Sequence, residues 1–168
     1  MERIAIIDGN SLINRAYYAM RNPMITKDGI FTQGIFGFLN MMEKIKIAAI
    51  QMPTVADKME NVRTVKAYLE KIKVEKPDFV ILPEMFCCPY QTENFPIYAE
   101  EEGGPIWQQL SAYAKQYGVY LIGGSMPEKD AEGNVYNTCY VFDREGKQIG
   151  KHRKVHLFDI DVKGGQTF

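Results

Sequence analysis

Two side chains in this 168-residue chain have the type and the position to carry out acid–base chemistry. Glu84 follows the apolar run 79–82 and a proline, and Lys154 lies just past a predicted strand in a basic run. A carboxylate at a strand end can act as a general base, and a nearby lysine can stabilise a developing oxyanion. Taken singly, each residue is more often part of a solvated surface.

A second acid, Asp8, closes the apolar run 3–8 near the N-terminus. A carboxylate there could bind a cation, but a two-metal nuclease needs a cluster of acids to hold its ions. Asp8 alone would bind Mg²⁺ poorly. Residues 1–44 carry five basic and four acidic side chains, which is no basic stripe for nucleic acid.

The elements that must position these residues alternate between strands and helices. Apolar runs predict strands at 3–8, 45–52, 79–82 and 119–122, and a hairpin of 136–142 with 147–152. Helices are expected at 12–20, at 35–44, from Pro53-Thr54 to 76–78 with Asp57 completing a capping box, and between Pro105 and Gly118. We expect a long loop at 86–104 and a turn at Met126-Pro127-Glu128. The order predicts an α/β fold with a mostly parallel sheet, whose strand ends bring chemistry together.

One stretch of the sequence contradicts itself. The helical stripe of Ile35, Phe38, Leu39 and Met42 runs into the strand pattern of 45–52 with no Gly or Pro between them. Such a conflict of local signals argues against one consistent design. We therefore predict a join between two unrelated pieces, residues 1–44 and residues 45–168.

Several short motifs in the second piece together form a specific pattern. They are Ile47-Ala48-Ala49-Ile50-Gln51-Met52, Leu82-Pro83-Glu84-Met85-Phe86, Gly123-Gly124-Ser125, Tyr136-Asn137-Thr138 and Arg153-Lys154-Val155-His156-Leu157-Phe158-Asp159. In this order and spacing, they resemble the carbon–nitrogen hydrolase (nitrilase) superfamily. Cys88-Pro89-Tyr90 and 158–162 narrow the resemblance to its ω-amidase branch. The resemblance implies part of a four-layer αββα sandwich and a small amide substrate, with no cofactor.

The resemblance also implies roles for individual residues. Glu84 would be the general base, and Lys154 would steady the tetrahedral intermediate. Phe86 and Tyr90 would line the pocket, and Glu128 is a possible pocket acid.

The family's nucleophile is a cysteine that attacks the amide carbon to form an acyl-enzyme. It follows the lysine motif at a distance that falls beyond the last residue of this sequence, as does a second acid. Cys87, Cys88 and Cys139 are not expected to replace it, because nucleophilic attack requires defined geometry at the base. The expectation is therefore no appreciable amide hydrolysis by this chain alone.

The first piece has a resemblance of its own. Residues 6–19, Ile6-Ile7-Asp8-Gly9-Asn10-Ser11-Leu12-Ile13-Asn14-Arg15-Ala16-Tyr17-Tyr18-Ala19, and the later run 34–39 look like the start of the 5′–3′ exonuclease domain of bacterial DNA polymerase I. That resemblance implies a βαα segment of a nuclease-type α/β domain. Asp8 would match a metal ligand, and Mg²⁺ would be a cofactor only if this segment functioned.

Composition limits the remaining classes of protein. The net charge of −1 disfavours nucleic acid as a partner, and no apolar run is long enough to span a membrane. Three cysteines, two of them adjacent, are typical of reduced thiols in a cytoplasmic protein. Half a sandwich would leave one sheet face uncovered, so we expect self-association or a homo-oligomer.

Three hypotheses remain open from the sequence. The chain is a carbon–nitrogen hydrolase by descent that is inactive as it stands, a nucleic-acid-binding or Mg²⁺-binding remnant of an exonuclease, or a chimera without biochemical function. Amide binding that depends on Glu84 and Lys154 would favour the first. Binding of Mg²⁺ or flap DNA that depends on Asp8 would favour the second.

Overall fold

The structure, a computed structural model, describes residues 26–29 and 45–156. Contacts divide the chain into two units, Met1–Lys46 and Ile47–Phe168. In the first unit, Thr26 accepts a hydrogen bond from the Gly29 N–H at 3.0 Å in an exposed turn. The strand predicted at 3–8, with Asp8, and the helices at 12–20 and 35–44 lie outside the described residues. The predicted boundary between 44 and 45 stays a prediction.

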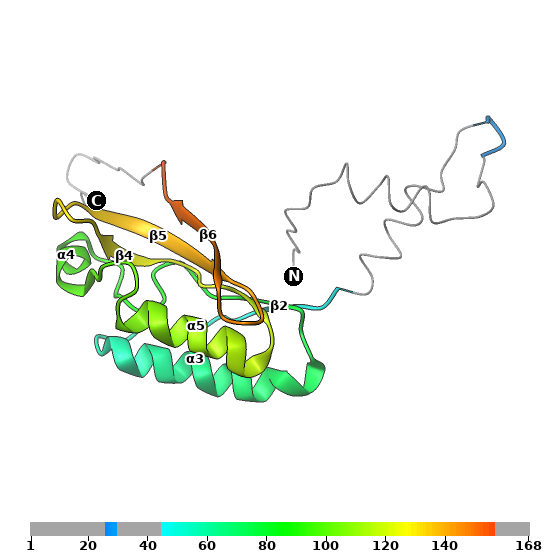
Figure 1. Cartoon of the computed structure of the whole chain (residues 1–168), viewed down its shortest axis with the longest axis horizontal. Helices are drawn as coiled ribbons and strands as arrows, with labels where there is room; N and C mark the ends of the chain where they lie inside the picture. The colour runs from blue at the N-terminus through cyan, green and yellow to red at the C-terminus, as the bar shows by residue number, and fades with distance from the viewer. Residues whose placement is uncertain (1–25, 30–44, 157–168) are drawn as a thin grey trace, which may run out of the picture. The chain divides into compact units, whose positions relative to one another are not determined.

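The described part of the second unit is built on a six-stranded mixed sheet (Figure 1). Its strands are β1 (Ile47–Ala49), β2 (Phe79–Ile81), β3 (Tyr120–Ile122), β4 (Met126–Lys129), β5 (Val135–Phe142) and β6 (Gln148–Arg153). The strand order is β1-β2-β3-β5-β4, and β6 also pairs with β5. The first three strands are parallel, and the pairings of β5 with β3, β4 and β6 are antiparallel. The sheet is therefore parallel only in its first half.

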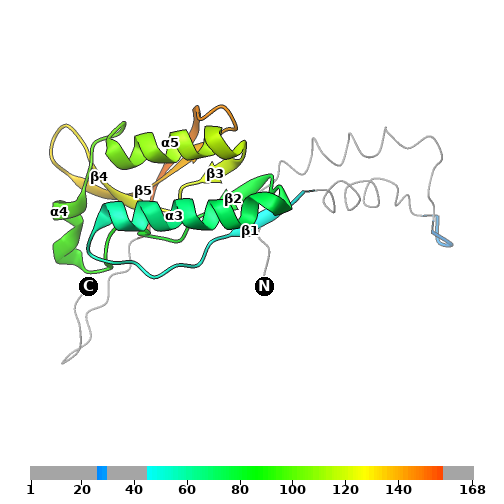
Figure 2. The same ribbon diagram turned by 90° about the horizontal axis from the view of Figure 1, so that it is seen from below.

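Two long helices cover one face of this sheet. They are α3 (Lys58–Ile72) and α5 (Pro105–Tyr117), and shorter segments are η1 (Lys73–Glu75), η2 (Thr92–Asn94) and α4 (Phe95–Tyr98). Both long helices lie on the same side of the strands, as the two views at right angles agree (Figures 1 and 2). The Tyr113 hydroxyl donates to the Val62 carbonyl at 3.4 Å, which ties α5 to α3.

The core fills the space between the helices and this sheet face. Because side chains alternate along a strand, Val80, Leu121 and Phe142 are fully buried toward the helices. Their strand neighbours on the other face are only half-buried; these are Phe79, Ile81, Tyr120, Ile122 and Val141. This apolar face is the surface on which the predicted self-association depends, and that association stays a prediction.

The start of α3 differs from the sequence prediction. The helix begins at Lys58, not at Pro53-Thr54, because the Asp57 side chain is itself the N-cap and accepts hydrogen bonds from the N–H groups of Met59 and Glu60. Asn61 occupies a buried position and bonds both backbone groups of Val55. Met59, in the first turn of the helix, is 37% exposed.

Two further segments correct the sequence analysis, and one confirms it. Residues 126–128, predicted as a turn, belong to strand β4. The buried Pro127 is tolerated there because β4 ends the strand order, and its other edge carries only an isolated bridge to Glu100 in the described ranges. The loop predicted at 86–104 contains η2 and α4. Helix α5 begins at Pro105 and ends before Gly118, whose φ of 63° closes it, as predicted.

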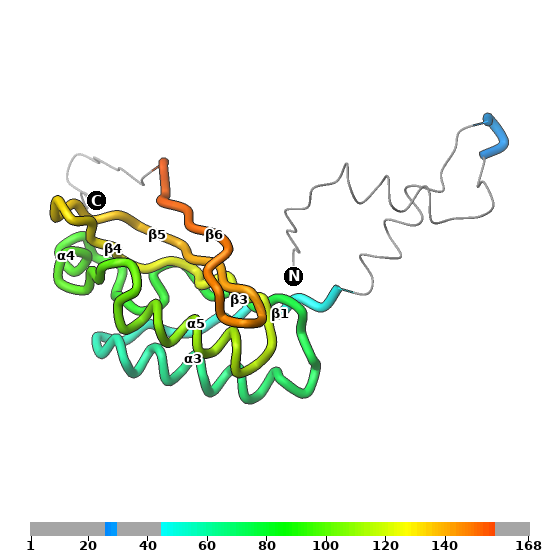
Figure 3. Tube along the Cα trace, in the orientation of Figure 1, coloured from blue at the N-terminus to red at the C-terminus, as the bar shows by residue number. Residues whose placement is uncertain are grey.

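The hairpin that delivers Lys154 is also confirmed. Figure 3 follows the trace from β5 through a tight turn into β6. The Asp143 N–H donates to the Lys147 carbonyl at 2.9 Å, and Gly146 takes a φ of 81° between them. None of the helices in the described ranges is both long and apolar enough to span a membrane.

Candidate active site

Glu84 is carried by a short loop that follows β2. The loop lies so close to the end of β3 that a Cβ on Gly124, whose φ is 62°, would come within 2.1 Å of the Pro83 carbonyl oxygen. Met85 has a φ of 49°, and its N–H donates to Ser125 Oγ at 3.0 Å. A left-handed residue other than glycine is uncommon, and here the buried Ser125 bond holds it in place. Glu84 therefore projects from a loop with a fixed backbone.

Glu84 receives two hydrogen bonds on one of its carboxylate oxygens. Lys154 Nζ donates to Glu84 Oε1 at 2.8 Å, although the two residues lie 70 positions apart in the sequence. Asn137 Nδ2, from β5, donates to the same Oε1 at 2.8 Å. The Lys154 N–H in turn donates to the Asn137 carbonyl at 2.8 Å. The two predicted catalytic residues are thus brought together, and Asn137 touches both.

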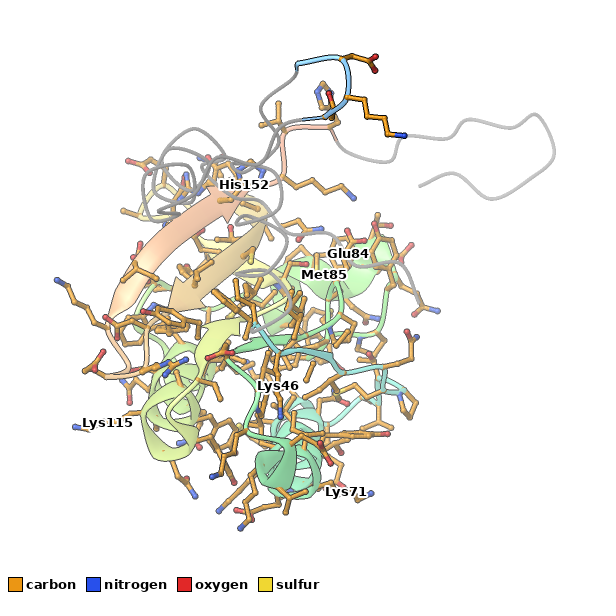
Figure 4. The ribbon with its side chains drawn as sticks, turned by 90° about the vertical axis from the view of Figure 1, so that its right-hand side faces the viewer. Lys46, Lys71, Glu84, Met85, Lys115 and His152 are labelled. Atoms are coloured by element: carbon orange, nitrogen blue, oxygen red, sulfur yellow. The ribbon has the colours of Figure 1, made fainter. Side chains whose placement is uncertain are left out.

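These residues border an open cavity of about 280 Å³. It is lined by Glu84, Ser125, Asn137, Cys139, His152 and Lys154. In Figure 4, Glu84 lies beside Met85, while Lys71 and Lys115 lie on the helices, away from Glu84. Since Cys139 pairs with His152 across β5 and β6, both side chains belong to the sheet face opposite the helices. The cavity therefore opens on that face.

The charges at this site remain in contact with water. The Glu84 side chain is 48% exposed and that of Lys154 is 33% exposed. The hydrogen bond to Glu84 is the main cause that raises the pKa of Lys154 above its usual value, and burial opposes it. Lys154 is therefore a cation at neutral pH, with donors that can reach a carbonyl oxygen in the cavity. Glu84 Oε2 has no hydrogen bond to any described residue, so this oxygen can accept a proton.

The three cysteines differ in their access to the cavity. Cys87 and Cys88 are 0% and 1% exposed, and burial raises the pKa of their thiols to about 12 and about 11. Cys139 is half-buried and lines the cavity, and burial raises the pKa of its thiol as well. All three are free thiols. Cys139 is therefore the cysteine that a ligand in the cavity would cover.

Glu128 lies on the opposite face of the sheet from the cavity. It is 2% exposed, and it accepts hydrogen bonds from Thr138 Oγ1 at 2.6 Å, Lys151 Nζ at 2.6 Å and Arg153 at 2.7 Å. Burial alone would raise the pKa of Glu128, but these donors hold it at about 2. Its partners are on the helix side of β5 and β6, so the structure does not place Glu128 with Glu84. Its predicted role as a pocket acid stays a prediction.

The two predicted pocket aromatics are placed differently from each other. Phe86 is 0% exposed within the core and does not line the cavity. Tyr90 is 44% exposed, stacks edge-on against Phe95 at 5.5 Å, and lies near enough to interact electrostatically with Lys154. Substrate binding by either residue stays a prediction.

Four cavity residues were not assigned a role from the sequence; they are Ser125, Asn137, Cys139 and His152. Asn137 and Ser125 do belong to two of the short motifs that carry the resemblance, and that is the signal that could have singled them out. In the described ranges, no group of three His, Cys, Asp or Glu side chains is placed to hold a metal ion. Asp8 lies outside those ranges.

Comparisons with known proteins match two families to this chain. A family model described as carbon-nitrogen hydrolase matches residues 46–168, and one described as the 5′-3′ exonuclease, N-terminal resolvase-like domain, matches residues 3–76. The chain is 46% identical to the omega-amidase NIT2 of Bos taurus over 127 residues, which are 76% of this chain and 46% of the relative. It thus spans about half the length of the curated relatives it matches.

Solved structures give the same result. Nit3 of Saccharomyces cerevisiae, a member of branch 10 of the nitrilase superfamily, superposes with a TM-score of 0.64 at 37% identity, over 67% of this chain and 45% of that one. An N-terminal amidase with an Asn-Glu-Ala peptide superposes with a TM-score of 0.62 at 25% identity, over 68% and 29%. Two family matches on one chain support the predicted chimera, and the chain belongs, through residues 46–168, to the carbon-nitrogen hydrolase family.

Proposed function

We propose that the cavity beside Glu84 and Lys154 is an amide-binding site of the omega-amidase kind. The observation that carries the proposal is the 2.8 Å ion pair between Glu84 and Lys154, formed at the cavity by residues 70 positions apart. A lysine ammonium can donate to the carbonyl oxygen of an amide, and a carboxylate can accept a proton from an attacking nucleophile. The amide class follows from the family and from relatives named as omega-amidases and an N-terminal amidase.

Hydrolysis of an amide needs one more group, a nucleophile that attacks the carbonyl carbon. Cys87 and Cys88 are buried thiols with raised pKa values, so neither supplies a thiolate at neutral pH. Burial raises the pKa of Cys139 as well, and no hydrogen bond to a described residue activates it through Glu84 or Lys154. This chain by itself is therefore proposed to bind amides without appreciable turnover.

Binding and turnover are measured separately on the full chain. Succinamate, the monoamide of a four-carbon dicarboxylic acid, is titrated into the ¹⁵N-labelled protein, and ammonia release is followed in parallel. Saturable shifts at Glu84, Asn137 and Lys154 are expected in the wild type and not in Glu84→Gln or Lys154→Met. No saturable shift in a folded wild type would refute the amide site. Ammonia release that disappears in Glu84→Gln would refute the absence of turnover.

The match of residues 3–76 to an exonuclease model supports a second candidate, a remnant that binds Mg²⁺ or DNA through Asp8. Titration with Mg²⁺ and with a flap DNA tests it in the same spectra. Shifts that Asp8→Asn abolishes would favour the remnant, whereas shifts that survive in Asp8→Asn would exclude this role for Asp8. The cytoplasmic location expected from the cysteines stays a prediction.

A further inference from the structure

We infer that Asn137 is a positioning residue that occupies Glu84 Oε1 together with Lys154 and so leaves Oε2 as the oxygen that accepts a proton. This inference deepens the proposed amide site and rests on it. It gives a role to a side chain that the sequence analysis left without one.

The hydrogen-bond pattern carries the inference. The Asn137 side chain and the Lys154 ammonium both donate to Oε1 at 2.8 Å, and no described residue donates to Oε2. Two donors on one oxygen restrict rotation of the carboxylate and leave the lone pairs of the other oxygen available. Without Asn137, a carboxylate that is 48% exposed could rotate and exchange its two oxygens at Lys154.

Asn137 can do this because its own position is fixed through the backbone. It lies in β5 opposite Pro127 of β4, and its carbonyl accepts the Lys154 N–H at 2.8 Å. One residue therefore sets both members of the ion pair, Glu84 through its side chain and Lys154 through its main chain. The main-chain bond survives any substitution of the side chain, so the two effects can be separated.

The test uses three variants of the full chain. Asn137→Leu removes the donor at similar volume. Asn137→Asp keeps the size and polarity and places a second carboxylate at Oε1. Tyr136→Phe is the matched control, because it removes a 2.9 Å hydrogen bond to Asp130 from the neighbouring position of the same strand, away from the cavity lining.

The first readout needs no ligand. The pKa of Lys154, followed through its ¹³Cε resonance, is expected to fall toward the ordinary value in Asn137→Leu, because Glu84 is no longer held against it. It is expected to rise in Asn137→Asp, where a second negative charge lies nearby, and to stay unchanged in Tyr136→Phe. A pKa of Lys154 that is the same in all four proteins would overturn the inference, and a merely structural role for Asn137 predicts that result.

The second readout is the affinity for succinamate. Asn137→Leu is expected to weaken binding roughly tenfold in the wild type but to add little in a Glu84→Gln background, since its effect acts through Glu84. Additive losses would overturn the inference. If the wild type binds no succinamate while the pKa of Lys154 shifts as expected, the amide proposal fails and the positioning role of Asn137 stands.

Discussion

Glu84 and Glu128 lie on opposite faces of one sheet. Each accepts hydrogen bonds from a β5 side chain and from a lysine, but they differ in solvent exposure. Adjacent residues of β5 point to opposite faces, so Asn137 donates to Glu84 and Thr138 donates to Glu128. Each glutamate also pairs with a lysine, Lys154 or Lys151. Glu84 is 48% exposed at a cavity, whereas the side chain of Glu128 is 3% exposed. The difference teaches that burial decides what a Glu–Lys pair does. The buried Glu128 pair stabilises the fold, whereas the exposed Glu84 pair is available to a ligand.

Glu128→Gln should be the most damaging change. It removes the buried charge that pairs with Lys151 and Arg153, and it weakens four hydrogen bonds. We expect the free energy of unfolding, measured with urea at neutral pH, to fall by about 3 kcal/mol. Glu132→Gln, a change of an exposed glutamate, is the matched control. Equal midpoints for Glu128→Gln and its control would contradict a structural role for the Glu128 cluster.

The same pair of proteins has a defined pH dependence. The folded-state pKa of Glu128 is lowered to about 2 from an ordinary value of 4.5, so the unfolded chain takes up this proton first on acidification. The advantage of wild type over Glu128→Gln should be complete above pH 4.5 and should shrink as the pH falls toward 2. An advantage that stays constant across this range would show that Glu128 does not titrate as described.

Gly124→Ala should destabilise the loop that carries Glu84 on the open face of the sheet. A Cβ would meet the Pro83 carbonyl oxygen at 2.1 Å, and a φ of 62° is unfavourable for alanine. We expect a loss of about 2 kcal/mol in urea unfolding, together with shifted amide resonances at Glu84 and Met85. Gly133→Ala is the matched control, because that glycine also has a positive φ but no atom within 4 Å of the added Cβ. Equal losses of stability in Gly124→Ala and Gly133→Ala would show that the close approach of Gly124 to Pro83 does not position the loop.

Glu84→Gln should have the smallest effect on stability. Exposed ion pairs contribute about 0–1 kcal/mol, and the amide of glutamine can still accept a hydrogen bond from Asn137. We expect the urea midpoint to stay close to the wild-type value while succinamate binding is lost. A large loss of stability would show that Glu84, like Glu128, stabilises the fold, and would contradict the difference between the two faces.

The sequence predicted those helix ends and turns that are marked by proline and glycine. Pro105 and Gly118 bound α5 as predicted, and the hairpin turn at 143–146 was predicted from its composition. Strand β4 was missed because Pro127 reads as a turn residue, and only its edge position makes it compatible with a strand. The start of α3 was misplaced because Asp57 was read as a residue inside the helix, whereas it is the cap.

The candidate site was predicted only in part, for a different reason. The pairing of Glu84 with Lys154 could be expected from the resemblance, because no local rule joins residues 70 positions apart. The sequence could not predict which face of the sheet Asn137 and Glu128 occupy, because the register of β4, β5 and β6 decides this. Because residues 126–128 were predicted as a turn, the pairing of β4 with β5 could not be predicted.

Alkylation of Cys139 tests the central claim, an amide-binding cavity at Glu84 and Lys154, most directly. Cys139 lines the cavity, while the buried Cys87 and Cys88 should react only on unfolding and serve as internal controls. With iodoacetamide at about pH 9, where a raised thiol pKa still leaves some thiolate, the account predicts that succinamate slows Cys139 modification in the wild type but not in Glu84→Gln. Equal Cys139 rates with and without succinamate in the folded wild type would contradict it.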